Sequence, residues 1–157
     1  MTNAIYENRI EFVDSVIKID PSIISYKSNA QMTYLHLAIS DSITISQYNI
    51  IQLMIKNGFD VNARANHGIS PLMVAIKTKH SSVVRLLVKK GANIDGQPDS
   101  GYTALMISAI RYPFDQIPNL IKLGASVDIK HNDGFSAFEN VLARKEISAM
   151  KLITFFT

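Results

Sequence analysis

The chain has 157 residues, of which 47% are hydrophobic and 18% charged, so we expect one soluble folded unit with a continuous apolar core. It contains no cysteine, which excludes disulfide bonds and thiol catalysis, and it has no apolar run of about 18 residues that would predict a membrane-spanning helix. The formal charge of +3 and the pI of about 9.1 give a mild preference for acidic partners.

Helical periodicity begins at Ile10–Ile19, where apolar residues recur at three- and four-residue spacing, and Asp20-Pro21-Ser22 ends it. We expect this segment to be the second helix of a partial repeat. Pairs of shorter apolar stretches follow, separated by turn sequences such as Asn66-His67-Gly68 and Asn132-Asp133-Gly134. Near the far end, Ile147–Phe156 predicts a last apolar helix, which is either buried or used in an interface.

Two interleaved series of glycines recur at intervals of 33 residues. One series lies in the turns that precede the helix pairs and comprises Gly68, Gly101 and Gly134. The other follows the second helix of each pair and comprises Gly58, Gly91 and Gly124. Two series in one register are hard to obtain by chance, and an interval of this size predicts a repeat architecture.

The residues around these glycines form recurring motifs. The helix pairs open on Thr33-Tyr34-Leu35-His36-Leu37-Ala38, Ser70-Pro71-Leu72-Met73-Val74-Ala75, Thr103-Ala104-Leu105-Met106-Ile107-Ser108-Ala109 and Ser136-Ala137-Phe138-Glu139. They close on Leu53-Met54-Ile55-Lys56-Asn57-Gly58, Leu86-Leu87-Val88-Lys89-Lys90-Gly91-Ala92 and Leu120-Ile121-Lys122-Leu123-Gly124-Ala125. These motifs resemble the Gly-x-Thr-Pro-Leu-His-x-Ala opening and the Leu-Leu-x-x-Gly-Ala ending of the ankyrin repeat, over about residues 26–153. The resemblance implies an all-α ankyrin-repeat α-solenoid, built from helix–turn–helix repeats with β-turn or hairpin-like connections.

The motif residues have physical roles. Ser or Thr at the start of each pair caps the first helix, and Pro71 suits its first turn. A glycine after the second helix fits a left-handed C-cap. We expect a single domain over residues 1–157. Its predicted parts are a partial repeat at 1–28, a repeat with an insertion at 29–65, repeats at 66–98 and 99–131, and a degenerate repeat at 132–157.

The sequence departs from the regular pattern at three places. The first full repeat has four extra residues, which we place at Ser42–Ile45 in the loop between its helices. Gln31 stands where its turn glycine belongs. Pro113 and Pro118 predict that the second helix of the 99–131 repeat is short or shifted.

Residues that point to chemistry are few. Among the four histidines, no pair has the i, i+3 or i, i+4 spacing, and a zinc site needs three or four converging ligands. His36 belongs to the hydrogen-bond scheme that the resemblance implies, whereas His67 and His131 fall on turn tips and are expected to be solvated. We find no phosphate-binding loop and no nucleophile elbow. We therefore expect no enzyme, no metal and no cofactor.

The resemblance implies that partners bind on a concave side formed by turn tips and first helices. The residue after each turn position is apolar, and we call these four residues the apolar row: Met32, Ile69, Tyr102 and Phe135. Such residues either pack between neighbouring turns or contact a partner. We favour partner contact for Tyr102 and Phe135, because large rings are costly to leave exposed. The predicted rim is mostly cationic and comprises Arg64, His67, Lys77, Arg111, Lys130 and Arg144.

The leading functional hypothesis is a protein-binding module whose partner presents apolar and acidic surface. Two alternatives remain open: an inhibitor of the immunity-protein kind that neutralises one target, and a structural module that dimerises through its apolar C-terminal helix rather than staying monomeric. Lys and Arg are spread along the chain, so nucleic-acid binding is not expected. No membrane partner is expected either, because no apolar run is long enough to span a bilayer. Met1-Thr2-Asn3-Ala4 does not resemble a secretory leader, so we expect a cytoplasmic protein or one delivered without a leader.

Overall fold

The structure is a computed structural model that describes residues 1, 10–40, 44–110 and 116–143. The chain divides into two compact units, residues 1–92 and residues 93–157. Within the described residues, every regular element is an α-helix or a short 3-10 helix, and extended pairing is limited to one antiparallel bridge between Lys130 and Ser136. The predicted all-α class is confirmed.

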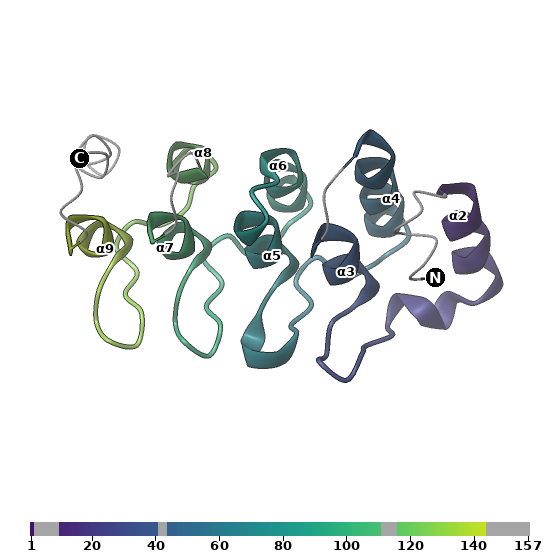
Figure 1. Cartoon of the computed structure of the whole chain (residues 1–157), viewed down its shortest axis with the longest axis horizontal. Coiled ribbons are helices and arrows are strands. Elements are labelled where there is room, and N and C mark those ends of the chain that lie inside the picture. Colours follow the sequence, from purple (N-terminus) through teal and green to yellow (C-terminus); the bar gives the residue numbers. More distant parts are fainter. Residues whose placement is uncertain (2–9, 41–43, 111–115, 144–157) are drawn as a thin grey trace. The chain divides into compact units, whose positions relative to one another are not determined.

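The first unit contains helices α2 to α6. Their bounds are α2 Ile10–Ile19, α3 Tyr34–Ser40, α4 Ile45–Lys56, α5 Pro71–Lys77 and α6 Ser81–Lys89, with 3-10 turns η1 Pro21–Ile24 and η2 Asn66–Gly68. Helix α3 packs against both α4 and α5, α5 packs against α6, and α2 packs against α4. Figure 1 shows that α4 and α6 lie on the side of α3 and α5 opposite the connecting turns. This unit therefore presents a helical face and a turn face.

The second unit contains α7 Ala104–Ala109, α8 Gln116–Lys122 and α9 Ala137–Ala143. Helix α7 packs against both α8 and α9. The long turns that precede α7 and α9 lie side by side in Figure 1, and side-chain hydrogen bonds connect them. This unit therefore repeats the helix–turn arrangement of the first.

Helices α5, α7 and α9 begin where a hydroxyl side chain caps them. Ser70 Oγ accepts the backbone N–H of Met73 at 3.3 Å, and Thr103 Oγ1 accepts that of Met106 at 3.3 Å. Pro71 occupies the first turn of α5, as its fixed φ favours. After α6 the chain reverses at Gly91, whose φ of +88° is the predicted left-handed C-cap. The capping predictions are confirmed for Ser70, Thr103 and Ser136 and for the glycines that follow the second helices.

The core consists of aliphatic and Met side chains from facing helices. In the first unit the largest fully buried ones are Leu35, Ile39, Ile50, Ile51, Met54, Leu72 and Leu87. In the second unit they are Leu105, Met106, Ile117 and Leu120. Because each of these side chains is withdrawn from water, each contributes roughly 1.5–3 kcal/mol of transfer free energy.

The insertion in the first full repeat differs from its prediction. Ile45, which we placed in the loop, is the first residue of α4, and Thr44 Oγ1 caps the helix by accepting the backbone N–H of Gln47 at 3.2 Å. Helix α4 has 12 residues and α6 has 9, so most of the inserted length extends the helix. A run of Ile, Ser and Gln continues a helix once Thr44 supplies its cap.

The proline prediction is confirmed in part. Helix α8 has only 7 residues, and Pro118 lies in its first turn, where a missing N–H leaves no helical bond unmade. Pro113 and the predicted helix Ile147–Phe156 lie outside the described residues.

Candidate partner-binding surface

In the first unit, adjacent turns carry Met32 and Ile69. The backbone N–H of Asn66 donates to the carbonyl of Ala30 at 3.0 Å, which connects the two turns directly. Both apolar side chains are half-buried. Part of each side chain therefore packs inside the protein, and the rest remains available to a partner.

His36 fixes the turn that carries Ile69. Its Nδ1 accepts the backbone N–H of Thr33 at 3.2 Å, so Nε2 carries the proton and donates to the carbonyl of Ile69 at 3.0 Å. The ring is fully buried, and burial lowers its pKa below 6.5 although the Ile69 carbonyl acts in the opposite direction. The expected hydrogen-bonding role of His36 is confirmed.

The predicted rim of the first unit lies on the surface. Arg64, His67 and Lys77 are all exposed, Arg64 and His67 in or next to the turn and Lys77 in the last turn of α5. His67 adopts a left-handed conformation with φ of +59°. For His67, solvation at a turn tip is confirmed.

In the second unit, three rings lie together: Tyr102 and His131 are stacked, and Phe135 is tilted against His131. The imidazole of His131 lies nearly parallel to the ring of Tyr102, with centroids 4.2 Å apart and planes inclined by 12°. Phe135 lies on the same imidazole with centroids 5.7 Å apart and a tilt of 40°. Tyr102 is half-buried, whereas Phe135 remains 52% exposed. Of the two rings, Phe135 offers more surface to a partner.

The expectation that His131 is solvated is wrong. Its side chain is buried, and its Nδ1 accepts the backbone N–H of Asp133 at 3.1 Å. The sequence held a signal for this, because the equivalent positions one and two repeats earlier are Pro98 and Ala65. A position that holds small or apolar residues in the other repeats is expected to face the interior, and at this position the His131 ring contacts the rings of Tyr102 and Phe135.

Two exposed polar neighbours of Tyr102 and Phe135, Gln97 and Asn132, connect adjacent turns through hydrogen bonds. Asn132 Nδ2 donates to the carbonyl of Asp99 at 2.8 Å, and Gln97 Nε2 donates to the carbonyl of Lys130 at 3.0 Å. The Lys130 side chain is exposed, with Nζ 3.9 Å from a carboxylate oxygen of Glu139. The two other predicted cations of this unit, Arg111 and Arg144, lie outside the described residues.

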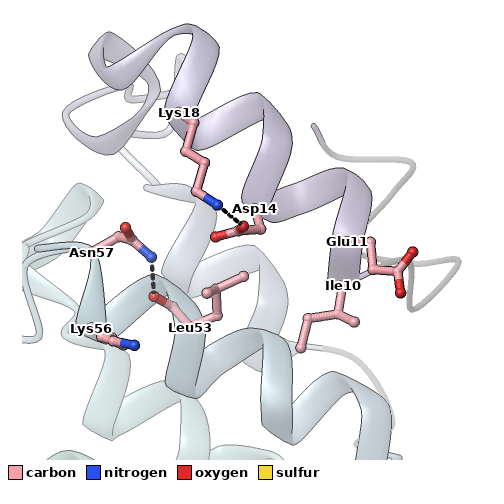
Figure 2. A pocket seen from close by; sticks show the side chains of 7 residues that line it. All are labelled: Ile10, Glu11, Asp14, Lys18, Leu53, Lys56 and Asn57. Carbon is pink, nitrogen blue, oxygen red and sulfur yellow. Dashed lines mark hydrogen bonds and ion pairs between the residues drawn. The ribbon is translucent and has the colours of Figure 1, made fainter.

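A groove of about 490 Å³ lies between α2 and α4 (Figure 2). Its apolar lining comes from Ile10 and Leu53, and its charged lining has equal numbers of acids and bases. Figure 2 shows Lys18 directed at Asp14, with which it forms an ion pair, while Asn57 donates to the carbonyl of Leu53. With its charges balanced, this groove has no preference for a ligand of either sign.

Across residues 10–40, 44–110 and 116–143, no three His, Asp or Glu side chains gather as a metal site would require. Over the same ranges, no helix is long and apolar enough to cross a bilayer.

The repeat geometry agrees with a comparison of the sequence with known families. A family model described as ankyrin repeats in three copies matches residues 43–133, more than half of the chain. The chain belongs to the ankyrin-repeat family. Ankyrin repeats are general protein–protein interaction modules, and the family is typically non-catalytic. No curated protein matches the chain.

Proposed function

We propose that this ankyrin-repeat protein binds a partner protein through its turn tips, using the apolar row as anchors and the cationic rim for orientation. The observation that carries the proposal is the half-exposed ring of Phe135 on the buried imidazole of His131. A ring held in place from below loses little conformational freedom on binding, and aromatic residues are enriched in protein interfaces. Met32 and Ile69 supply apolar surface to the first unit's turns.

The charge of the rim indicates which kind of partner surface would bind. Arg64 and Lys130 are exposed cations in or next to the turns, and Lys77 is an exposed cation in the last turn of α5. Such charges attract acidic groups and speed the encounter of two proteins. Lys130 is already near Glu139, so we expect Lys77 to contribute more than Lys130. The proposed partner therefore combines apolar side chains with acidic neighbours.

A substitution pair tests the proposal. Phe135→Ala removes the exposed ring, and Phe12→Ala is the matched control, because Phe12 on α2 is 47% exposed and far from any turn of the apolar row in sequence. Both variants and the wild type are used to capture proteins from the native cell, followed by quantitative mass spectrometry. The proposal requires a partner that Phe12→Ala retains and Phe135→Ala loses. A partner that both variants retain equally would overturn it.

The two alternatives make separate predictions. A dedicated inhibitor forms one tight complex of fixed stoichiometry, whereas a general adaptor captures several proteins weakly. Self-association through residues 147–156 involves residues outside the described part of the chain. Light scattering across a range of concentrations tests it, because a mass that stays at one chain contradicts dimerisation.

A further inference from the structure

The first unit has a second groove, on the helical face rather than at the turns. It has a volume of about 350 Å³ and lies between α4 and α6. Tyr48 and Gln52 line it from α4, and Ser82, Arg85, Lys89 and Lys90 line it from α6 and the residue that follows. We call this site the cationic groove. Figure 1 places α4 and α6 on the side opposite the turns, so the groove is distinct from the first unit's part of the apolar row.

The lining of the cationic groove carries three positive charges and no negative one. Arg85, Lys89 and Lys90 are exposed, and none of them forms an ion pair within the described ranges 10–40, 44–110 and 116–143. This differs from the groove between α2 and α4, where Lys18 is neutralised by Asp14. The cationic groove therefore keeps its full charge for a ligand.

The surrounding sequence reinforces this charge. Residues 42–94 contain seven of the sixteen Lys and Arg residues but only one of the thirteen Asp and Glu residues, Asp60. Lys and Arg residues occur along the whole chain, but in this segment almost no acidic residues accompany them, so the positive charge is concentrated here. With one acid in more than fifty residues, the segment that forms α4 and α6 has little to offset the positive potential of the groove.

Helix stability accounts for only part of this arrangement. Lys89 and Lys90 lie at the C-terminal end of α6, where cations interact favourably with the helix dipole. Arg85 lies in the middle of α6, four residues before Lys89, and like charges at this spacing destabilise a helix by about 0.2–0.5 kcal/mol. Arg85 therefore has no stabilising role within the helix, and an external anion would relieve the repulsion.

The groove also has apolar surface suited to a peptide. Leu86 lines it with 7% of its surface exposed. Ile45, 85% exposed, is not part of the lining but precedes Tyr48 by three residues in α4, so it lies next to the groove on the same face of the helix. Lys89 and Lys90 lie at the C-terminal end of α6, and Arg85 lies in the middle of this helix. We propose that the cationic groove binds an acidic, amphipathic segment of a partner protein, with an apolar side chain against Ile45 and carboxylates against Arg85 and Lys89.

The number of cations favours a protein segment over nucleic acid. Duplex binders commonly neutralise about 6–10 phosphates, and three cations in a short groove supply far fewer. Tyr48 is half-buried, so it does not provide the exposed stacking platform that single strands use. Gln52 and Ser82, in contrast, present hydrogen-bonding groups that suit a peptide backbone.

The test measures binding of a fluorescein-labelled peptide of repeated Leu-Glu-Glu units to the whole chain by fluorescence anisotropy. Its partner probe has Gln in place of every Glu. The variant Arg85→Glu plus Lys89→Glu reverses two groove charges. The control Lys27→Glu plus Lys122→Glu makes the same change of net charge at two exposed cations that belong neither to a groove nor to the cationic rim. Circular dichroism verifies that both variants remain helical, and Arg85→Gln plus Lys89→Gln replaces the first if it does not.

We expect the acidic peptide to bind and the Gln peptide not to bind, with affinity that falls as salt rises. Reversal of Arg85 and Lys89 should weaken binding about tenfold, since each exposed pair contributes up to about 1 kcal/mol. The control should keep wild-type affinity. The proposal would be overturned if both variants lost affinity for the acidic peptide equally, or if only the control lost it. It would also be overturned if the Gln peptide bound as well as the acidic one. The same holds if oligo-dT or phosphatidylserine vesicles bound more tightly at Arg85 and Lys89 than the acidic peptide does. None of these outcomes depends on Phe135, so this proposal and the turn-tip proposal fail separately.

Discussion

Tyr102 and His131 stack face to face with ring centroids 4.2 Å apart, although they come from consecutive turns. The imidazole is buried, so the half-buried tyrosine ring covers it. Tyr102 therefore stabilises the second unit by covering His131. Phe135, which is 52% exposed, contributes less to this packing. Two members of the apolar row that have equivalent positions in the repeat differ in what they contribute.

This difference predicts unequal effects on stability. Tyr102→Ala removes the stack and exposes the His131 ring, so we expect the free energy of unfolding to fall by about 2 kcal/mol. Phe135→Ala removes a ring that is already half in water, and we expect a loss of less than about 1 kcal/mol. Urea denaturation followed by circular dichroism measures both. Equal losses for the two variants would show that the stack does not support the turn.

A second pair of substitutions concerns two turn glycines. Gly101 and Gly134 both have positive φ, +77° and +86°, so an alanine at either position is strained by about 1–2 kcal/mol. A Cβ on Gly101 would also lie 2.8 Å from the backbone nitrogen of Asn132, whereas a Cβ on Gly134 meets nothing within 4 Å. To relieve this contact, Asn132 must move and weaken its bond to the carbonyl of Asp99.

We therefore expect Gly101→Ala to cost about 3 kcal/mol in total and Gly134→Ala only the conformational part. The shift of the urea midpoint gives the comparison, and Gly134→Ala is the control for the strain of the left-handed conformation. A smaller loss for Gly101→Ala than for Gly134→Ala would contradict the close approach of the two turns.

His36 predicts a pH dependence of stability. Burial lowers its pKa in the folded protein below 6.5, so below that pH the unfolded chain binds more protons than the folded one. The free energy of unfolding should therefore be complete above about pH 6.5 and fall as the pH falls below it. Protonation also places a hydrogen on Nδ1, which then no longer accepts the N–H of Thr33.

His36→Met isolates this effect, because Met73 and Met106 occupy the equivalent position in the next repeats and both are buried. The variant should lose about 1–3 kcal/mol at neutral pH, since the Ile69 carbonyl loses its donor. Its melting temperature should vary less than that of the wild type between pH 5 and 7. An unchanged slope in this range would assign the pH dependence to other groups.

The repeat interval predicted most of the fold, because glycines and capping residues act locally. Even Gln31, which replaces a turn glycine, keeps the left-handed conformation with φ of +56°, since its neighbours fix the turn. Burial of His131 and the charge of the cationic groove were not predicted. Both depend on side chains from segments about 30 or more residues apart, Tyr102 for the first and Tyr48 with Arg85 for the second. The sequence motif of a single repeat does not predict contacts between side chains of different repeats.

The last prediction concerns the cap of α9. Ser136 and Glu139 form a reciprocal capping box, in which the Glu139 carboxylate accepts the backbone N–H of Ser136 at 2.6 Å and Ser136 Oγ accepts that of Glu139 at 3.3 Å. This backbone hydrogen bond is the main reason that the pKa of Glu139 lies below 4.5. The stabilisation it gives is present above about pH 4.5 and is lost as the pH falls through the lowered pKa.

Glu139→Gln keeps an acceptor for the Ser136 N–H but removes the charge, so it should lower the urea midpoint less than Glu139→Ala and should not show this acid-dependent loss. Ser136→Ala removes the other half of the box and should lower the midpoint while the pH dependence due to Glu139 persists. The measurement is the urea midpoint of each variant at neutral pH and near pH 4. If Glu139→Ala and Glu139→Gln are equivalent at both, the carboxylate does not cap α9, and the helix begins there because Ser136 alone caps it.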